Sequence, residues 1–300
     1  MTRHAFKHGK RTRAVAAAVL GLALGACHHA PSNAPIAFLA QGDGRWQVWW
    51  LPTPDASPKQ VTRLSHDVAR LSWFPSGQEV LANLQDGSLV RVNVRTGATQ
   101  PVAFPFAGIL DAVIGPDGRR VAFSMSLADS NDRNDIWTYD LQSGDRRKLF
   151  SMPGLQHEPT WSPDGKSIYF LSGKGQQTHD IWRVDVASGS TEQLTVNSLY
   201  HFDLAVRGDG TLAYSGNQGG NYDLWLLSPK GKPERLMDDA ALDARPSWSP
   251  DGESLVFEST REGEMPDLWR WDEDTRRIKR MTHIAGGARM PVWAATGDRQ

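Results

Sequence analysis

The chain has 300 residues, of which 39% are hydrophobic and 22% charged, with 33 Lys and Arg against 34 Asp and Glu. This balance argues against the basic surface that nucleic-acid binding usually needs. Because the chain holds a single Cys, it cannot form an internal disulfide, and a fold of this size must be stabilised by packing.

Residues 1–26 are predicted to be a lipoprotein signal peptide. Five basic residues precede an apolar run, Ala14–Leu24, that is too short to cross about 30 Å of hydrocarbon as a helix. The next residues, Leu-Gly-Ala-Cys, resemble the bacterial lipobox, in which a peptidase cuts before the Cys and its thiol is acylated. This resemblance implies lipidation of Cys27 and a tether over residues 27–34. An ordinary secretory signal cut near Ala26 is the alternative.

Lipidation also predicts where the protein resides. Acyl chains contribute about 0.8 kcal/mol per buried CH₂, so two or three of them hold a domain on a membrane. An Asp after Cys27 would resemble the inner-membrane retention signal, but His28 stands there, so we expect the periplasmic side of the outer membrane. Residues 1–26 hold five of the 33 basic residues and none of the 34 acidic ones, so the remaining chain has a formal net charge of −6.

Residues 159–195 contain four short apolar runs separated by turn signals. The first run ends near Trp161 and is followed by Pro-Asp-Gly, in which Pro sets φ and Gly supplies a positive φ. Further strands are predicted at Ser167–Ser172, Ile181–Val186 and Gln193–Thr195. The short links predict one antiparallel four-stranded sheet, which cannot cover its own apolar faces.

The same pattern recurs along the chain. The position of Trp161, which we call the marker of the repeat, recurs at Trp73, Ile114, Val206, Trp248 and Trp293, and successive markers are 41, 47, 45, 42 and 45 residues apart. Second strands recur at Val80–Leu84, Val121–Met125, Leu212–Gly216 and Leu255–Ser259. Third strands begin at Asp135, Asp180, Asp223 and Asp267, and fourth strands end at Leu149, Leu194, Leu236 and Met281. Four strands repeated at this period are typical of a β-propeller blade.

The two ends of the chain are predicted to share one blade. Ile36–Ala40 has the pattern of a second strand, Gln47–Trp49 of a third and Gln60–Thr62 of a fourth. Pro291–Ala295 has the pattern of a first strand with nothing after it. We therefore expect an all-β, monomeric, six-bladed propeller with four-stranded blades over residues 35–300, closed by the C-terminal strand, which completes the N-terminal blade.

The Ser-Pro-Asp-Gly turn, the Asp-Ile/Leu-Trp strand and the Leu-Thr ending resemble the WD-like repeats of the TolB family, over roughly residues 35–296. This resemblance implies a propeller that serves as a binding platform for envelope proteins. The N-terminal α/β domain through which TolB contacts inner-membrane Tol proteins is expected to be replaced here by the tether. The repeat also resembles those of prolyl-oligopeptidase-type enzymes, whose Ser-Asp-His triad lies in a separate α/β domain that is not expected here.

Tryptophan and aspartate recur at fixed positions of the repeat. Nine Trp are predicted to form the core between blades, with a stacking surface for sugars or peptides as the alternative: Trp49, Trp73, Trp137, Trp161, Trp182, Trp225, Trp248, Trp269 and Trp293. Trp46, Trp50 and Trp271 depart from the pattern and are predicted to be exposed or half-exposed contacts. The Asp that begins each third strand is predicted to cap a turn by accepting backbone N–H bonds.

A candidate site lies three residues before each marker, where five of six residues are charged: Arg70, Asp111, Glu158, Asp203, Arg245 and Met290. Symmetry predicts that these residues lie at equal height near the start of the innermost strands, with His157, His201 and Arg289 as further candidate ligands. One interpretation is a structural ring of ion pairs. Another is a binding site for a chain end, or for a cation such as calcium held by Asp111, Glu158 and Asp203. No other cofactor is predicted.

Signs of catalysis are few. The chain has no Gly-x-Ser-x-Gly elbow, no HExxH and no phosphate loop, so no catalytic residue is predicted. Asp129, Asn131 and Asp132 in Leu127–Asn134 resemble a calcium loop, but the Gly and Glu of that motif are missing, which favours a solvated polar loop. Propeller lyases use metal-bound histidines, and His157, His201 and His283 keep that alternative open.

The sequence as a whole indicates a lipid-anchored, non-catalytic binding module of the bacterial envelope, in which one face of a rigid ring docks a protein or peptide. The alternative is a small-ligand receptor or an enzyme, acting on a saccharide or peptide in the channel. A third interpretation is a structural accessory of an outer-membrane assembly.

Overall fold

The computed structural model of the protein describes residues 1, 32–126, 134–173, 179–196, 201–217 and 220–295. The chain divides into two units, Met1–Ala30 and Pro31–Gln300, and the described strands all belong to the second. Cys27 and most of the Leu127–Asn134 loop lie outside the described residues, so lipidation and the calcium-like loop stay predictions. Within the described ranges, no helix has the length and apolar character needed to cross a bilayer.

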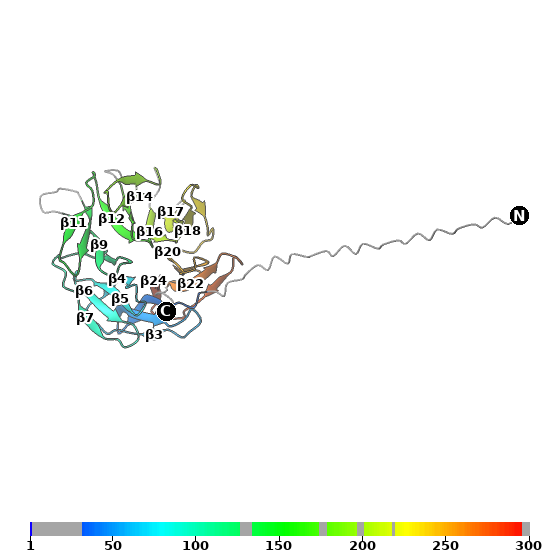
Figure 1. Cartoon of the computed structure of the whole chain (residues 1–300). Coiled ribbons are helices and arrows are strands. Elements are labelled where there is room, and N and C mark those ends of the chain that lie inside the picture. Colours follow the sequence, from blue (N-terminus) through cyan, green and yellow to red (C-terminus); the bar gives the residue numbers. More distant parts are fainter. Residues whose placement is uncertain (2–31, 127–133, 174–178, 197–200, 218–219, 296–300) are drawn as a thin grey trace. The chain divides into compact units, whose positions relative to one another are not determined.

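Six antiparallel sheets of four strands each, numbered here as blades 1–6, follow one another around a ring (Figure 1). Blade 1 contains β24 (Ala288–Trp293), β1 (Ile36–Gly42), β2 (Arg45–Leu51) and β3 (Lys59–Gln60). Blade 2 contains β4 (Val68–Trp73), β5 (Glu79–Leu84), β6 (Leu89–Asn93) and β7 (Thr99–Pro101). Blade 3 contains β8 (Val113–Ile114), β9 (Arg120–Met125), β10 (Asp135–Asp140) and β11 (Arg146–Lys148).

The other three blades have the same order of strands. Blade 4 contains β12 (Gln156–Trp161), β13 (Ser167–Ser172), β14 (Asp180–Asp185) and β15 (Thr191–Gln193). Blade 5 contains β16 (His201–Val206), β17 (Leu212–Asn217), β18 (Tyr222–Leu227) and β19 (Glu234–Arg235). Blade 6 contains β20 (Asp243–Trp248), β21 (Ser254–Ser259), β22 (Asp267–Asp272) and β23 (Ile278–Arg280). The predicted all-β, six-bladed fold is confirmed.

The strand ends differ from the prediction at two places in the repeat. β24 covers Ala288–Trp293 and not the predicted first strand Pro291–Ala295, because Arg289 and Pro291 hide the strand pattern at its start. Fourth strands end before the apolar residue that was predicted to close them. Leu194 follows β15, although its N–H still donates to the Ile181 carbonyl at 2.8 Å. The leucine therefore anchors the end of the blade without belonging to a regular ladder.

The core lies between blades. Ile36 and Phe38 of blade 1 pack with Val256 and Leu268 of blade 6, and all four are fully buried. Each sheet thus covers an apolar face of its neighbour, which a single sheet could not do for itself.

The tryptophans follow this arrangement. Six of the nine repeat tryptophans are buried and the other three are half-buried against the core, as predicted. Trp46 and Trp50 are half-buried. The prediction for Trp271 was wrong, because its side chain is 3% exposed and packs with Trp248 and Trp269. Trp271 lies two residues after Trp269 on β22 and therefore shares its buried face.

The aspartates that begin the third strands do not chiefly cap turns, which corrects that prediction. Asp267 accepts from the Thr282 hydroxyl at 2.8 Å and forms an ion pair with Arg280, although it also accepts from the Ile284 N–H at 3.3 Å. Asp135 binds Lys148 in the same way, at 2.9 Å. The carboxylate therefore ties the third strand mainly to side chains of the fourth.

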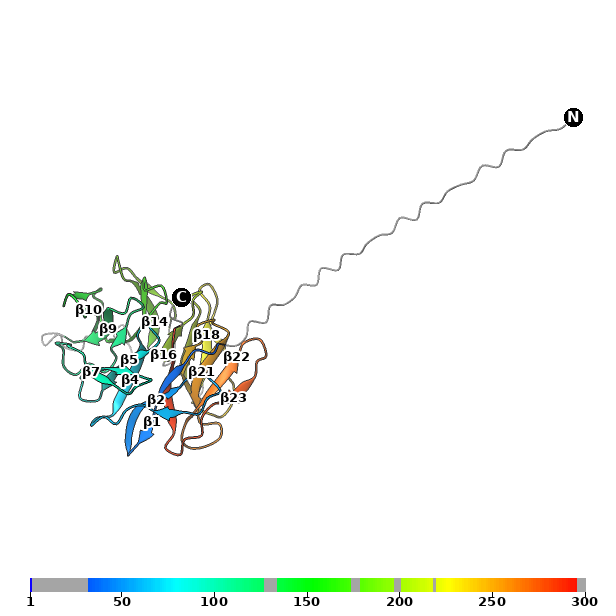
Figure 2. The ribbon, with the colours of Figure 1, turned by 60° about the horizontal axis from the view of Figure 1, so that its bottom comes forward.

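The ring closes where β24 pairs with β1 in an antiparallel register that joins Ile36 to Trp293 and Ala40 to Ala288. Figure 2 shows the blue β1 and β2 beside the red C-terminal strand. The indole Nε1 of Trp293 donates to the Ala34 carbonyl at 3.0 Å, and the Trp293 N–H donates to the Ser247 hydroxyl of blade 6 at 3.0 Å. One residue thus joins the two chain ends and the neighbouring blade.

We predict that Trp293→Ala lowers the free energy of unfolding by about 3–5 kcal/mol, because it removes a buried indole and its hydrogen bond. The matched control is Ile278→Ala on β23, where the side chain is 36% exposed, with an expected loss of about 1 kcal/mol or less. Chemical denaturation of both variants measures the difference. An equal loss in the two variants would contradict a special role for the closing strand.

Candidate functional site

The first strands are bulged at the level of the predicted site. In blades 4, 5 and 6 the pairing of first and second strands shifts register just after His157, Phe202 and Ala244. The backbone is left-handed at the residue three before the marker in four blades, with φ between 51° and 56°, at Glu158, Asp203, Arg245 and Met290. Such a conformation costs a residue with a side chain about 1–2 kcal/mol, so neighbouring contacts must hold it.

Those contacts are hydrogen bonds from one blade to the next. The Glu158 N–H donates to Asp111 Oδ2 at 3.2 Å, and the Asp203 N–H donates to Glu158 Oε2 at 2.9 Å. Farther around the ring, the Met290 N–H donates to Glu258 Oε2 at 2.9 Å. A left-handed residue turns its N–H out of its own ladder, and a carboxylate of the preceding blade accepts it.

Blade 6 continues the same series through a hydroxyl group. The Arg245 N–H donates to Ser215 Oγ at 3.1 Å, and Ser215 Oγ donates to Asp203 Oδ2 at 3.3 Å. The guanidinium of Arg245 lies 2.5 Å from Glu258 Oε1 and 3.6 Å from Asp203 Oδ1. We call this series, from Asp111 to Met290, the bulge relay.

The structure brings together only part of the predicted constellation. Asp111, Glu158, Asp203 and Arg245 share the bulge relay. Arg70 of blade 2 donates to the Pro159 carbonyl of blade 4 at 3.4 Å. Arg289 instead covers the Trp46 ring, with its guanidinium carbon 3.7 Å from the ring centroid.

The two histidines of the constellation have different neighbours. His157 Nδ1 lies 3.8 Å from Glu158 Oε1, and its ring meets that of His179 edge-on at 4.7 Å between centroids. The His201 side chain is buried against Tyr214, with 4.6 Å between ring centroids.

Sequence reasoning missed Glu258 and Ser215. Glu258 is 3% exposed and lies in the otherwise uncharged second strand Ser254–Ser259, where a lone acid is the available signal. The bulges had a signal as well, because Pro follows Glu158, Arg245 and Met290 and cannot donate to a strand ladder.

The carboxylates of the relay are not gathered around one point. Among the residues the structure describes, no three His, Cys, Asp or Glu side chains form a group that could hold a metal ion. Asp111 Oδ2 accepts from the Ser124 hydroxyl at 2.6 Å, while Glu158 and Asp203 make the contacts given above. The described geometry gives no support to a cation held jointly by these three residues.

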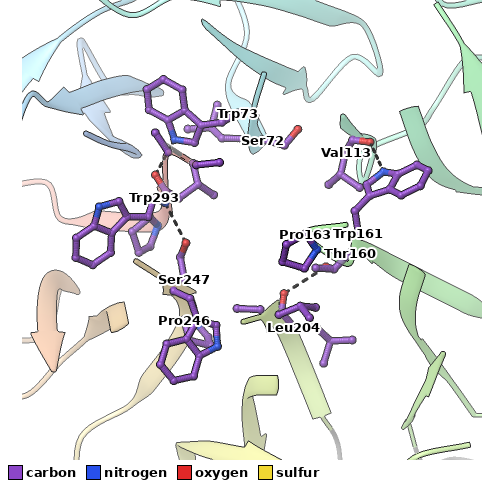
Figure 3. Close-up of a pocket in the computed structure, with 18 of the residues that line it drawn as sticks. Ser72, Trp73, Val113, Thr160, Trp161, Pro163, Leu204, Pro246, Ser247 and Trp293 are labelled. Atoms are coloured by element: carbon purple, nitrogen blue, oxygen red, sulfur yellow. Dashed lines mark hydrogen bonds between the residues drawn. The ribbon is translucent and has the colours of Figure 1, made fainter. Parts of the chain in front are cut away.

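Two hollows adjoin the relay. A cavity of 670 Å³ occupies the channel, lined by the first strands of all six blades, and Figure 3 shows residues of this lining around an open centre. Arg70, Asp203 and Arg245 line its inner end, at the level of the bulges, and the turns after the first strands, which include the Pro-Asp-Gly turns of blades 3, 4 and 6, line the other end. A second hollow of 450 Å³ lies between blades 3 and 4, where Asp111, His157 and Glu158 face Ser126 and Asn134.

A family model described as the TolB beta propeller domain matches residues 84–297. The chain belongs to this TolB beta propeller domain family. The Tol-Pal system protein TolB of Nitratidesulfovibrio vulgaris is 26% identical over 231 residues, which are 70% of this chain and 51% of that protein. The crystal structure of TolB from Acinetobacter baumannii matches with a TM-score of 0.74 and 24% identity over 88% of this chain and 67% of that chain. This chain thus spans about half the length of the first of these relatives.

The TolB-type repeat also occurs in a peptidase. The uncharacterized peptidase YuxL of Bacillus subtilis is 31% identical over 167 residues, which are 54% of this chain and 23% of the peptidase. Membership of the TolB propeller family therefore identifies the fold and leaves the activity open.

In this TolB-type propeller, the surroundings of the bulge relay shift the pKa values of two neighbouring carboxylates in opposite directions. Burial opposes ionisation of Glu158, but the neighbouring His157 imidazole, the Arg70 charge and the hydrogen bond from the Asp203 N–H together lower its pKa to about 2. Burial raises the pKa of Asp203 to about 6, with the charges of Glu158 and Glu258 adding to it and Arg245 opposing it. The same ring therefore holds one acid that stays ionised and one that accepts a proton near neutral pH.

We predict that the free energy of unfolding of Asp203→Asn, taken relative to that of the natural chain, increases as pH rises from about 4 to about 7. Folded Asp203, with a pKa of about 6, holds a proton that the unfolded chain releases near its ordinary value of 3.8. Ionisation therefore lowers the free energy of unfolding across this range, and Asn is spared that loss.

Urea denaturation at several pH values measures the effect. The control is Asp164→Asn, because the Ser162 hydroxyl lowers the pKa of Asp164 below its ordinary value of 3.8, so this carboxyl is ionised in both states and its replacement should have an effect that changes little between about pH 4 and about pH 7. If the free energy of unfolding of Asp203→Asn, relative to that of the natural chain, decreases as pH rises, the raised pKa of Asp203 is contradicted.

Proposed function

We propose that this chain is a lipid-anchored, non-catalytic binding module of the bacterial envelope, which docks a protein of the Tol-Pal system on one face of its propeller. The choice of docking face rests on the distribution of exposed apolar side chains. We call the end of the ring at which the first strands begin the leading face. In an antiparallel meander, the links between second and third strands lie at this same end.

The exposed large hydrophobic side chains gather at the leading face. Leu110, Leu155 and Leu242 precede the first strands of blades 3, 4 and 6 and are 42%, 50% and 37% exposed. Val196, which follows β15, is 70% exposed, and Met265, in the link between β21 and β22, is 45% exposed. Apart from Met1 and Ile278, no other large hydrophobic residue among those the structure describes is exposed to this degree. Apolar side chains gathered on one face mark an interaction surface.

The opposite end of the propeller has a different chemistry. Its turns are rigid and polar, since Asp117, Asp164 and Asp251 each accept a backbone N–H two residues later. A protein partner gains affinity from apolar contacts around a rigid surface, because little ordering accompanies binding. The leading face offers such contacts beside the charged hollow formed by Asp111, His157 and Glu158.

The names of the TolB relatives support the choice of partner, since those proteins belong to Tol-Pal systems. The lipobox-like sequence before Cys27 supports an anchor, and His28 supports the periplasmic side of the outer membrane. The absence of the catalytic motifs sought in the sequence supports a non-catalytic role.

We predict that Cys27→Ala abolishes incorporation of radiolabelled palmitate and moves the protein from the membrane fraction to the soluble fraction, because acyl chains are its only predicted attachment. Cells producing the natural chain and the variant are compared after fractionation. Ala26→Gly, which retains the Cys, is the matched control and should keep the label. Label that persists in Cys27→Ala would contradict lipidation at this residue.

We predict that Leu155→Arg weakens binding of a purified Tol-Pal protein from the same organism by about tenfold or more, because a charge replaces an apolar contact on the leading face. Lys166→Glu lies on an opposite-end turn and is the matched control, with unchanged affinity expected. Biolayer interferometry against each Tol-Pal component measures the dissociation constants. The proposal fails if no component binds, or if the two variants bind alike.

A further inference from the structure

The channel cavity has the size and lining of a small-molecule site. Its volume of 670 Å³ lies within the range of about 300–1,000 Å³ that ligand sites usually occupy. Between its two ends the first strands contribute an apolar wall, including Leu71, Val113, Leu204 and Val292. This cavity is separate from the exposed apolar residues of the leading face, so the inference below does not depend on the proposed docking.

The polar atoms of this wall are engaged in holding the blades together. Ser72 Oγ accepts the Ile114 N–H at 3.0 Å, and Ser247 Oγ accepts the Trp293 N–H at 3.0 Å. Thr160 donates its hydroxyl to the Leu204 carbonyl at 3.2 Å. Figure 3 shows Ser72, Thr160 and Ser247 around the open centre. The middle of the cavity therefore suits an apolar stem more than a polar one.

Charge is concentrated at the inner end, where Arg70, Arg245 and Asp203 line the cavity. Arg245 is already paired, because its guanidinium lies 2.5 Å from Glu258 and 3.6 Å from Asp203. Arg70 differs, since no carboxylate of the described residues lies within ion-pair distance and its one described hydrogen bond is the 3.4 Å contact with the Pro159 carbonyl. Because Glu258 and Asp203 already pair with Arg245, Arg70 is the guanidinium at this end that remains available to an anion; its charge acts on Glu158 only from beyond ion-pair distance.

We propose that the channel binds an amphipathic monoanion, whose carboxylate pairs with Arg70 while its apolar stem fills the cavity toward the Pro-Asp-Gly turns. A guanidinium presents paired N–H donors that match the two oxygens of a carboxylate. A single guanidinium without a carboxylate partner matches one carboxylate better than a phosphate dianion. The apolar wall supplies the remaining affinity through burial of the stem.

Two kinds of ligand combine a carboxylate with an apolar stem. One is a free aliphatic carboxylate, and the other is a peptide whose last residue is apolar and carries the C-terminal carboxylate. Octanoate and the peptide acetyl-Gly-Gly-Leu are therefore both used as probes on the full-length chain. Octan-1-ol and the C-terminal amide of the same peptide are the neutral controls. Binding of octanoate alone identifies the free carboxylate, and binding of the acidic peptide identifies a chain end.

Ligand-observed NMR titration measures each dissociation constant. We expect octanoate or the acidic peptide to bind at on the order of 1 mM or tighter, and its neutral control at least about tenfold more weakly. Arg70→Gln should weaken the charged probe about tenfold, Arg70→Lys should restore most of the affinity, and Arg63→Gln, at an exposed surface arginine, should change nothing.

Equal binding of the charged and neutral probes, or unchanged binding in Arg70→Gln, would overturn the proposal. Should Arg70→Gln fail to fold, as thermal unfolding would show, the comparison of charged and neutral probes on the natural chain still decides the question.

Discussion

The pairing of β24 with β1 is the constraint on which the rest of the structure depends. A four-stranded sheet has two apolar faces, and each blade buries them against its neighbours, so the series must return to its start. The chain achieves this by placing the first strand of blade 1 at its far end, where Trp293 contacts Ala34 as well as Ser247 of blade 6. With the ring closed, every first strand faces the channel at the same height.

That equal height makes the bulge relay possible. Each left-handed residue is costly alone, yet its N–H meets an acceptor from the preceding blade. The acids that look in the sequence like free ligands are therefore largely occupied in holding blades together, as Glu158 does for the Asp203 N–H. Two features remain for binding. Arg70 makes one hydrogen bond among the described residues, to the Pro159 carbonyl, and apolar side chains lie around the leading face.

The repeat could be recognised in the sequence because three features recur in one order: the marker position of Trp161, the Asp that begins the third strand and the apolar residue that ends the fourth. The repeat predicted the number of blades, the second strands and the closure of the ring. The limits of the prediction lie where several blades act together. The position in the repeat predicted that Glu158 and Asp203 lie at equal height along the channel. The hydrogen bonds between them depend on bulges in the first strands, which the sequence pattern did not reveal. Glu258 was missed because it lies on a second strand and reaches the relay from there. Trp271 was misjudged because it was treated as an exception, although the alternation of β22 places it on the face of Trp269.

The proposed functions use two separate parts of one rigid ring. The leading face gathers exposed leucines for a protein partner, while the channel combines an apolar wall with an arginine at its inner end. Both require the ring to stay closed, because an open ring would leave neither the channel wall nor a fixed face.

Native-state hydrogen exchange measured by mass spectrometry tests this closure most directly. Our account predicts that amides of β24 and β1 exchange only through global unfolding, with the same opening free energy as those of β13 in blade 4. Amides of β24 that exchange through a much smaller opening, while β13 stays protected, would contradict it.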